Sequence, residues 1–180
     1  MEDDICLLER FLNGEHVAFE QLVRKYQDTV LNIVYSLVGR DREAEDIVQE
    51  VFLKVYAHAG SFRRDAQFST WIYRIAVNMT YDFLRRRKNT VSDEAALENT
   101  PTSGANPQEA LCGKERDALI RKAMAGIPFA YRSALVLRDV EGLEYAQIAK
   151  VLKCGIGTVE SRIFRARQFL KEQLRTVLGE

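Results

Sequence analysis

Cysteine and proline are scarce in this sequence, and long apolar runs are missing. The three cysteines, Cys6, Cys112 and Cys154, lie far apart, which excludes a disulfide framework or a CxxC metal site and leaves reduced thiols packed as small hydrophobic groups. With only 3 Pro and 10 Gly in 180 residues, the chain is not of a low-complexity or fibrous type. No stretch approaches the ~18 uninterrupted apolar residues of a membrane span, and the acidic start, Met1 to Asp4, has the wrong charge for a secretory signal. We therefore expect a cytoplasmic protein.

What the sequence does contain is the composition of a folded protein, with 47% apolar, 29% charged and 9% aromatic residues. A length of 180 residues suits one ordinary domain or two small ones. The net charge is zero, but the charges are segregated. Residues 1–60 carry 12 acidic and 6 basic side chains, and residues 91–112 carry 4 acidic side chains and no basic one. Basic side chains are in excess in the other two blocks, with 7 basic and 2 acidic in residues 61–90 and 13 basic and 8 acidic in residues 113–180. Two basic blocks around an acidic spacer are typical of a protein that contacts one polyanion twice, although solvated helix faces give a similar pattern.

Residues 91–108 separate two regions of helical periodicity. This stretch lacks an apolar repeat and contains Pro101, Gly104 and Pro107, so we predict a flexible acidic linker over residues 91–110. On either side, apolar residues recur every three or four positions without strand alternation, which predicts an all-α fold of two small helical domains, 1–90 and 111–180. The expected helices cover residues 4–13, 16–38, 41–58, 69–88, 109–126, 129–140, 144–152 and 156–177.

The expected helix 41–58 has an apolar face and an opposite, mostly polar face. At about 100° per residue, the core face contains Ala44, Ile47, Val48, Val51 and Val55. The opposite face contains Asp46, Gln49, Glu50 and Leu53, with Tyr56 at its edge. A leucine within a polar face suits a docking surface with an apolar centre and a charged rim; the alternative is a solvated face with one stray leucine. No ExxH motif accompanies the acidic residues of this helix, so we expect no metal site at Glu43, Asp46 and Glu50.

The expected helix 69–88 combines cations, an amide and an aromatic ring on its outer face. Its buried stripe is predicted to be Ile72, Ile75, Ala76, Met79 and Phe83, and its outer face Arg74, Val77, Asn78, Tyr81 and Arg85. The preceding loop adds two further rings and more cations, through Phe62, Arg63, Asp65, Gln67 and Phe68. Guanidinium groups follow phosphates while rings stack on unpaired bases at ~1–3 kcal/mol each, so this surface suits single-stranded nucleic acid. The alternative is that Phe62 and Trp71 are ordinary core aromatics, and for Trp71 alone core packing is the better interpretation.

Residues 143–170 have the pattern of a helix-turn-helix. The first, short helix has an inner face of Tyr145, Ile148, Val151 and Leu152, and a tight turn over 153–156 leads to a second helix that opens at Gly157 and Thr158. In the second helix, Val159, Ile163, Ala166 and Leu170 point inward. The outward positions are Glu160, Ser161, Phe164, Arg165 and Gln168, with Arg162 and Arg167 on the shoulders. Arg and Gln side chains bond base edges in a major groove and flanking Arg grips phosphates, which favours DNA binding over the alternative of a plain helical hairpin.

Three motifs occur in a fixed order: Asp46 to Phe52 (DIVQEVF), Phe68 to Asn78 (FSTWIYRIAVN), and GLEYAQIA from Gly142 followed by GTVESRIFRAR from Gly157. Together they resemble the extracytoplasmic-function (group 4) family of bacterial RNA polymerase sigma factors, and the resemblance covers nearly the whole chain. It implies a dissociable promoter-specificity subunit that is not an enzyme and needs no cofactor, metal or small-molecule substrate. The implied partners are core RNA polymerase, through its β and β′ subunits, promoter DNA, and an anti-sigma factor that in some cases holds the protein at the inner membrane.

The resemblance also assigns roles to the positions that match the motifs. Core polymerase binding falls to Asp46, Gln49, Glu50 and Leu53. The downstream (−10) motif is recognised and melted, which requires extrusion of a base at a cost of a few kcal/mol. The resemblance assigns this role to Phe62, Arg63, Asp65, Gln67, Phe68, Arg74, Asn78, Tyr81 and Arg85. Asn78 occupies the base-contacting position. Recognition of the upstream (−35) motif falls to Arg138, Tyr145, Thr158, Glu160, Ser161, Phe164, Arg165 and Arg167. The acidic linker is similar to the segment that threads toward the RNA exit path of the polymerase.

Position 160 departs from the family pattern, because Glu160 stands where many members have Lys or Arg. A carboxylate can accept a hydrogen bond from the amino group of cytosine. We therefore predict that Glu160 reads a C·G pair in the upstream motif. A second departure, Ala146 in place of a common Glu, has no function attached to it.

Two other classes of function are open at this point. A free-standing helix-turn-helix transcriptional regulator, whose first lobe senses a ligand or dimerises, would share the second helix pair but would not form a complex with core polymerase. A nucleic-acid hydrolase is opposed by the residues themselves. His16 and His58 stand at unrelated positions, and the sequence has neither a Cys/His pair at motif spacing nor a glycine-rich phosphate loop.

Overall fold

The computed structural model describes residues 3–39, 42–63, 66–91 and 123–178, and every regular element within those ranges is helical. The all-α prediction is therefore confirmed for the described part of the chain. The elements are α1 (Asp4–Leu12), α2 (His16–Val38), α3 (Arg42–His58), the short 3-10 helix η1 (Ala59–Ser61), α4 (Phe68–Val91), α6 (Phe129–Leu135), the π-helix η2 (Val136–Val140), α7 (Tyr145–Leu152) and α8 (Ile156–Leu178).

The predicted helix bounds agree with the structure to within three residues for α1 to α4, α7 and α8. The predicted linker falls, apart from its first residue at the end of α4, outside the described residues, as does most of the predicted helix 109–126. The helix predicted over 129–140 is present with these bounds, but its last five residues form the π-helix η2 instead of continuing α6. There the N–H of Glu141 bonds to the carbonyl of Val136, five residues back, at 3.2 Å. Gly142 then ends the segment with φ +67°, a left-handed conformation that favours glycine.

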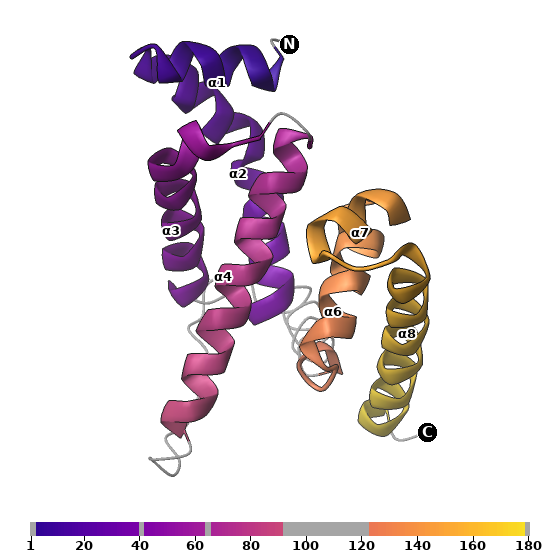
Figure 1. The fold of residues 1–180 in the computed structure, drawn as a ribbon. Helices are drawn as coiled ribbons and strands as arrows, with labels where there is room; N and C mark the ends of the chain where they lie inside the picture. Colours follow the sequence, from indigo (N-terminus) through magenta and orange to yellow (C-terminus); the bar gives the residue numbers. More distant parts are fainter. Residues whose placement is uncertain (1–2, 40–41, 64–65, 92–122, 179–180) are drawn as a thin grey trace, which may run out of the picture.

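The N-terminal lobe consists of α1 to α4, in which α2, α3 and α4 pack along one another and α1 lies across one end (Figure 1). Its core follows the helical stripes, with Val30, Ile33 and Val34 of α2 and Val51 of α3 fully buried. The packing of α1 on α2 is reinforced by Asp4. Its carboxylate accepts hydrogen bonds of 2.5 Å from Lys25 Nζ and from the Tyr26 hydroxyl.

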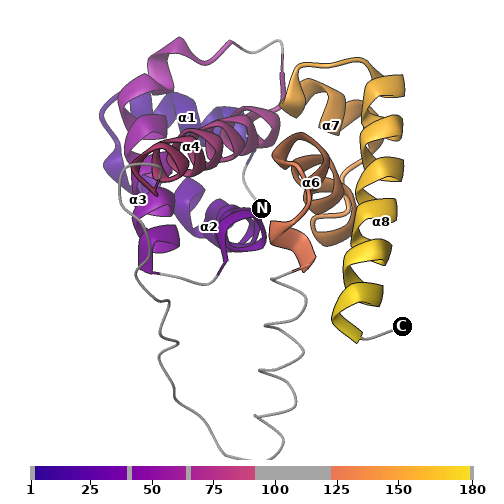
Figure 2. The same ribbon diagram turned by 90° about the horizontal axis from the view of Figure 1, so that it is seen from below.

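The C-terminal lobe consists of α6, η2, α7 and α8, and it packs beside the N-terminal lobe rather than apart from it (Figures 1 and 2). α7 contacts α4, and η2 contacts α2. Buried residues of both lobes form one continuous apolar cluster, which includes Ile72 of α4, Leu137 of η2 and Ile148 of α7. α8 lies on the outer side of the lobe and packs mainly on α6. None of the described helices combines the length and apolar character needed to cross a bilayer.

Candidate docking and nucleic-acid interfaces

The outward face of α3 carries an exposed leucine inside a polar rim. On the core side of the helix Ala44 and Val51 are fully buried and Val48 is half-buried, whereas Leu53 on the opposite side is 68% exposed. The three polar residues predicted to surround this leucine, Asp46, Gln49 and Glu50, are exposed as well. A single exposed leucine is ordinary on a protein surface, so a docking role depends on whether other apolar side chains lie beside it.

Leu53 borders an apolar groove between α2 and α3, which sequence reasoning did not find. The groove has a volume of about 440 Å³ and is lined by Phe19, Val23, Gln27, Val48, Gln49, Phe52, Leu53 and Tyr56. One end is formed by an aromatic cluster in which the Tyr56 ring lies 4.8 Å from that of Phe11 and 5.1 Å from that of Phe19. The signal for the α2 side was present in the sequence, since Phe19, Val23 and Gln27 recur every four residues and must share one stripe of a helix.

The loop before α4 is attached to the core by its aromatic rings. Phe68, predicted to present its ring to DNA, is instead buried at 2% exposure. Its ring packs 5.4 Å from Tyr26, 5.7 Å from Phe62 and 5.7 Å from Trp71. Phe62 and Trp71 are half-buried in the same cluster, as core packing predicts, and contact of their exposed edges with DNA stays a prediction. Of the polar loop residues predicted for the site, Arg63 and Gln67 are exposed, and Asp65 lies outside the described residues.

The predicted single-strand face of α4 is partly covered by the C-terminal lobe. Arg74 donates a hydrogen bond from Nη2 to the carbonyl oxygen of Lys150 at 2.6 Å, and the Tyr81 ring packs 5.1 Å from that of Phe129. Val77, predicted to face outward, is buried at 4% exposure. It lies between Arg74 and Tyr81 on the same helical stripe and belongs to the apolar cluster that both lobes share.

Two other predicted residues of this face, Asn78 and Arg85, remain exposed beside the covered stripe. At the loop end of the face, Gln147 Nε2 donates to Gln67 Oε1 at 3.5 Å, which adds a polar contact between the lobes. The Nε atom of Arg74 is buried without a hydrogen-bond partner. A buried donor left unsatisfied costs ~1–3 kcal/mol, so the contact between the lobes is incomplete at this charged group.

The helix-turn-helix predicted for residues 143–170 is present in the structure. α7 begins at a turn where the N–H of Glu144 donates to Gln147 Oε1 at 2.9 Å, which satisfies one of the free donors of the helix start. α7 ends at Leu152, and the φ of 49° at the following Lys153 places that residue in the left-handed region. The N–H of Cys154 then bonds to the carbonyl of Ala149 at 3.1 Å and closes the turn.

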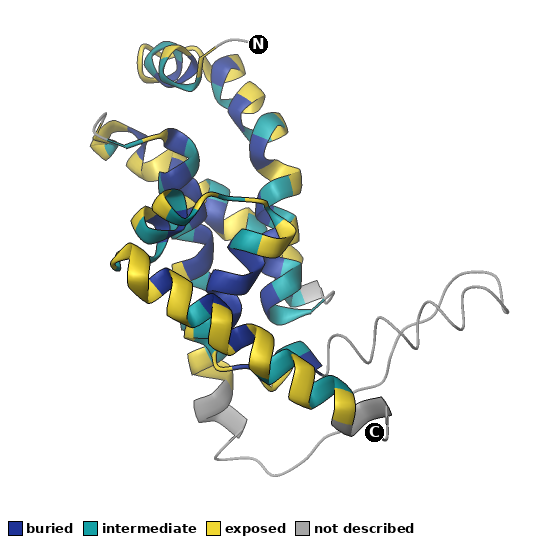
Figure 3. Ribbon diagram, turned by 90° about the vertical axis from the view of Figure 1, so that its right-hand side faces the viewer, coloured by how far each residue is buried: buried dark blue, intermediate teal, exposed yellow. Residues whose placement is uncertain are grey.

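The outer face of α8 is exposed from its start to Arg175, as the helix that leads to the C-terminus in Figure 3 shows. Phe164 is 63% exposed although it is a large apolar side chain. The other predicted contacts on this helix, Thr158, Glu160, Ser161, Arg165 and Arg167, are exposed as well. An unpacked aromatic ring among polar and cationic groups suits contact with base edges and thymine methyl groups.

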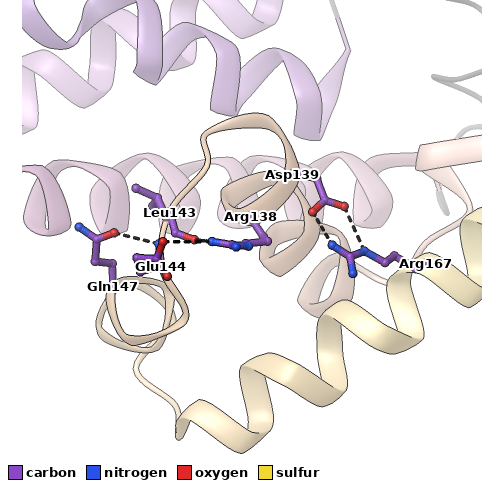
Figure 4. Close-up of polar contacts among 6 residues, drawn as sticks. All are labelled: Arg138, Asp139, Leu143, Glu144, Gln147 and Arg167. Atoms are coloured by element: carbon purple, nitrogen blue, oxygen red, sulfur yellow. Dashed lines mark hydrogen bonds and ion pairs between the residues drawn. The ribbon is translucent and has the colours of Figure 1, made fainter.

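Arg165 and Arg167, which flank the buried Ala166, form hydrogen bonds with residues of the segment that precedes the helix-turn-helix. Arg165 donates from Nη1 to the Tyr131 hydroxyl at 3.0 Å. Arg167 forms a bidentate pair with Asp139, with Nε–Oδ2 at 3.2 Å and Nη2–Oδ1 at 2.7 Å (Figure 4). Sequence reasoning missed Tyr131 and Asp139, because no local pattern connects them to a helix about thirty residues later.

The remaining two predicted upstream contacts, Arg138 and Tyr145, lie against each other. The guanidinium carbon of Arg138 is 5.2 Å from the centroid of the half-buried Tyr145 ring. Arg138 Nη1 also donates to the carbonyl oxygen of Leu143 at 2.8 Å and lies 3.6 Å from a carboxylate oxygen of Glu144. Arg138 therefore stabilises the turn that leads into α7 and presents only part of its side chain to solvent.

Three charged groups of the C-terminal lobe have shifted pKa values with clear causes. The hydrogen bonds that Arg167 donates to Asp139 raise the pKa of Arg167. Burial raises the pKa of Glu141, whose Oε1 is buried without a partner, and burial lowers the pKa of Arg132. Arg132 is 8% exposed and donates to the carbonyl of Met124 at 3.1 Å, so it has a structural role. Within the described ranges, no three His, Cys, Asp or Glu side chains gather in a way that could hold a metal ion.

Two family models match the chain in the order of the two lobes. Residues 22–90 match Sigma-70 region 2, and residues 117–170 match Sigma-70, region 4. The chain is 39% identical over 188 residues to the RNA polymerase sigma-H factor of Pseudomonas aeruginosa, covering 99% of this chain and 97% of that protein. It is 36% identical over 184 residues to the ECF RNA polymerase sigma-E factor of Escherichia coli K12, covering 97% and 96% respectively.

Solved structures agree with these matches. The fold is similar to that of CnrH in its complex with the cytosolic domain of CnrY, with a TM-score of 0.73, 24% identity and 97% of both chains covered. It is also similar to the sigma factor RpoE in complex with the anti-sigma factor NepR from Bartonella quintana, with a TM-score of 0.66, 26% identity, and 87% of this chain and 96% of that chain covered. Full-length identity well above 30% and both region matches show that this chain belongs to the extracytoplasmic-function branch of the sigma-70 family of RNA polymerase sigma factors.

Proposed function

We propose that this sigma factor uses three of its surfaces in sequence: the α3 face for core RNA polymerase, the α8 face for the upstream promoter motif, and the α4 face for the melted downstream motif. The polymerase makes the phosphodiester bonds, and the sigma factor contributes binding and no chemistry. One observation carries the proposal. A single chain presents an exposed leucine beside an apolar groove on one lobe and an exposed aromatic and cationic helix on the other.

Docking on the polymerase is supported by the groove between α2 and α3. Leu53 and its polar neighbours Asp46, Gln49 and Glu50 form the rim, and Phe52 and Tyr56 extend the apolar surface toward α1. Such a groove fits the apolar stripe of an amphipathic helix, with the acidic rim facing basic residues of the partner. We assign this surface to the polymerase, and to its β and β′ subunits in particular, because the DIVQEVF motif forms it.

Reading of the upstream motif is assigned to the exposed face of α8. Phe164 and Ser161 are placed to contact base edges, and Glu160 is placed to accept from a cytosine amino group. Thr158, Arg165 and Arg167 flank these residues and suit contacts with phosphates or base edges.

Melting of the downstream motif is assigned to α4 and the loop before it. Asn78, Arg85, Arg63 and Gln67 are exposed and suit contacts with an extruded base and its phosphates. Arg74 and Tyr81 belong to the same face but contact the C-terminal lobe. We therefore propose that the lobes separate when the protein docks on polymerase, which uncovers Arg74 and frees the Tyr81 ring, already 46% exposed, for single-stranded DNA.

Control by an anti-sigma factor is proposed from the likeness to RpoE, whose solved complex contains the anti-sigma factor NepR. We propose a cytoplasmic location, which a role at the chromosome requires. Where the anti-sigma factor is membrane-bound, the inactive protein would be held at the inner membrane. The competing proposal of a free-standing regulator is disfavoured, because both sigma-70 regions match and the relatives align over nearly the whole chain.

The decisive experiment reconstitutes holoenzyme from the purified protein and core polymerase. We expect a stoichiometric complex at micromolar concentration and run-off transcripts from specific start sites on fragments of the source genome, none of which form with core polymerase alone. Alignment of the start regions then gives the two promoter motifs. A purified, folded protein that forms no complex with core polymerase would overturn the proposed function.

A further inference from the structure

The π-helix η2 places two adjacent, oppositely charged residues against the two helices of the helix-turn-helix. Arg138 points to the turn before α7, where it bonds to the carbonyl of Leu143 (Figure 4). Asp139 points the other way and holds Arg167 of α8 through two hydrogen bonds. Because the π turn carries one more residue than an α turn, it changes the direction in which successive side chains leave the helix. Two neighbouring residues of η2 thus hold both the turn before α7 and the helix α8.

The pair of Asp139 and Arg167 lies at the surface and next to the proposed DNA face. The side chain of Arg167 is 54% exposed and that of Asp139 is 41% exposed. A guanidinium group has five N–H donors, and Asp139 engages the Nε and one Nη2 donor. The donors that remain lie in the same plane and face away from the carboxylate, so their direction is fixed by the pair.

We propose that Asp139 is a positioning residue that makes DNA binding through Arg167 selective for the upstream motif; this inference rests on the proposed function of α8. An isolated arginine attracts phosphates on any DNA, which adds affinity without specificity. The carboxylate of Asp139 offsets that charge and holds the guanidinium in one orientation. Arg167 then contributes only where a phosphate lies in line with its remaining donors, which occurs when α8 is in register with its motif.

The test compares holoenzyme binding to two duplexes, one with the upstream motif found by run-off transcription and one with that motif scrambled. Asp139→Asn keeps the size and one acceptor oxygen of the side chain but removes its charge. We expect it to raise affinity for the scrambled duplex about 3- to 10-fold at low salt and to steepen the salt dependence by about one phosphate contact. The ratio of specific to scrambled affinity should fall by a similar factor. Glu20→Gln on α2 is the matched control, because it removes one exposed carboxylate that lies 4.0 Å from an arginine of its own helix.

A second background separates positioning from a structural role. In Arg167→Gln protein, adding Asp139→Asn should leave the ratio of specific to scrambled affinity unchanged. In otherwise wild-type protein, Asp139→Glu should keep most of the wild-type ratio, because the carboxylate is retained. An equal fall in the ratio with and without Arg167, or no fall in either, would overturn the inference. If Asp139→Asn does not fold, Arg167→Gln alone decides: it should weaken specific binding more than scrambled binding, and an equal loss on both duplexes overturns the inference. Wild-type holoenzyme that does not distinguish the duplexes contradicts the proposed function of α8 itself, which is a separate result.

Discussion

Glu160 is an exposed carboxylate in the second turn of α8, on a face proposed to meet an anionic groove. Its charge opposes DNA binding in general, so its presence there favours a specific hydrogen bond that offsets the repulsion. We expect wild-type holoenzyme to prefer a C·G pair at one upstream position by about 1–3 kcal/mol, or roughly 5- to 150-fold in affinity. Glu160→Ala should abolish that preference and raise affinity for the other pairs at this position, as measured by competition among duplexes with all four base pairs.

Glu160→Gln separates the charge of this residue from its ability to accept a hydrogen bond. The amide keeps one acceptor oxygen, so part of the cytosine preference should persist while electrostatic repulsion disappears. Relative binding to the four base pairs that is the same in Glu160→Ala and wild-type holoenzyme would remove Glu160 from recognition.

For single residues, the exposure of a side chain could be predicted from the sequence where it depends only on the position of the residue around its own helix. Leu53, Asn78 and Glu160 face outward as the 100° rule requires. Phe68 and Val77 were placed wrongly, because their burial depends on partners from other parts of the chain: an aromatic cluster for Phe68 and the apolar cluster that both lobes share for Val77. A helical period carries no information about such partners.

Among the elements, α3 gives the clearest test of docking. Leu53 is 68% exposed, so Leu53→Ala removes little from the folded core and should leave the melting temperature unchanged. Burial of this side chain in the complex should contribute about 1–2 kcal/mol, so we expect the variant to bind core polymerase roughly 5- to 30-fold more weakly in a fluorescence titration.

Leu12→Ala is the matched control for this prediction. Leu12, at the end of α1, is 52% exposed but does not line the groove. Its truncation should leave polymerase affinity within about twofold of wild type. Equal binding by Leu53→Ala and wild-type protein would show that the α3 face is solvated, which is the alternative that the sequence left open.

Helices with a strong apolar period could be predicted almost to the residue, as α2 and α8 show. η2 could not, because a π turn differs from an α turn by one hydrogen bond and leaves the apolar spacing nearly intact. The groove on α2 and α3 shows the same limit. Each helix carried its half of the lining in its own sequence, but only the packing of the two helices brings Phe19 and Leu53 to one surface.

For the whole molecule, the contact between the lobes is the feature that the sequence did not predict. The two lobes are connected by residues outside the described part of the chain, and the helical periods of the two lobes do not show which faces meet. The contact leaves Arg74 Nε buried without a partner, while the Tyr81 and Phe129 rings add apolar and aromatic contact. The lobes also share one buried apolar cluster, so a partner opens the contact only if it binds the separated lobes more tightly than the closed ones.

Phe129→Ala should shift the protein toward separated lobes without altering the surfaces assigned to DNA. An aromatic pair contributes about 0.5–1.5 kcal/mol beyond area burial, so its loss should raise the affinity of the free chain for a single-stranded downstream-motif oligonucleotide about 2- to 12-fold. The radius of gyration from X-ray scattering should rise as well. Phe169→Ala is the control, because Phe169 stacks at 5.9 Å on Tyr131 within the C-terminal lobe. A folded Phe129→Ala protein with unchanged oligonucleotide affinity and radius would mean that this contact does not hold the lobes together, and Arg74 and Tyr81 would then need no uncovering to meet DNA.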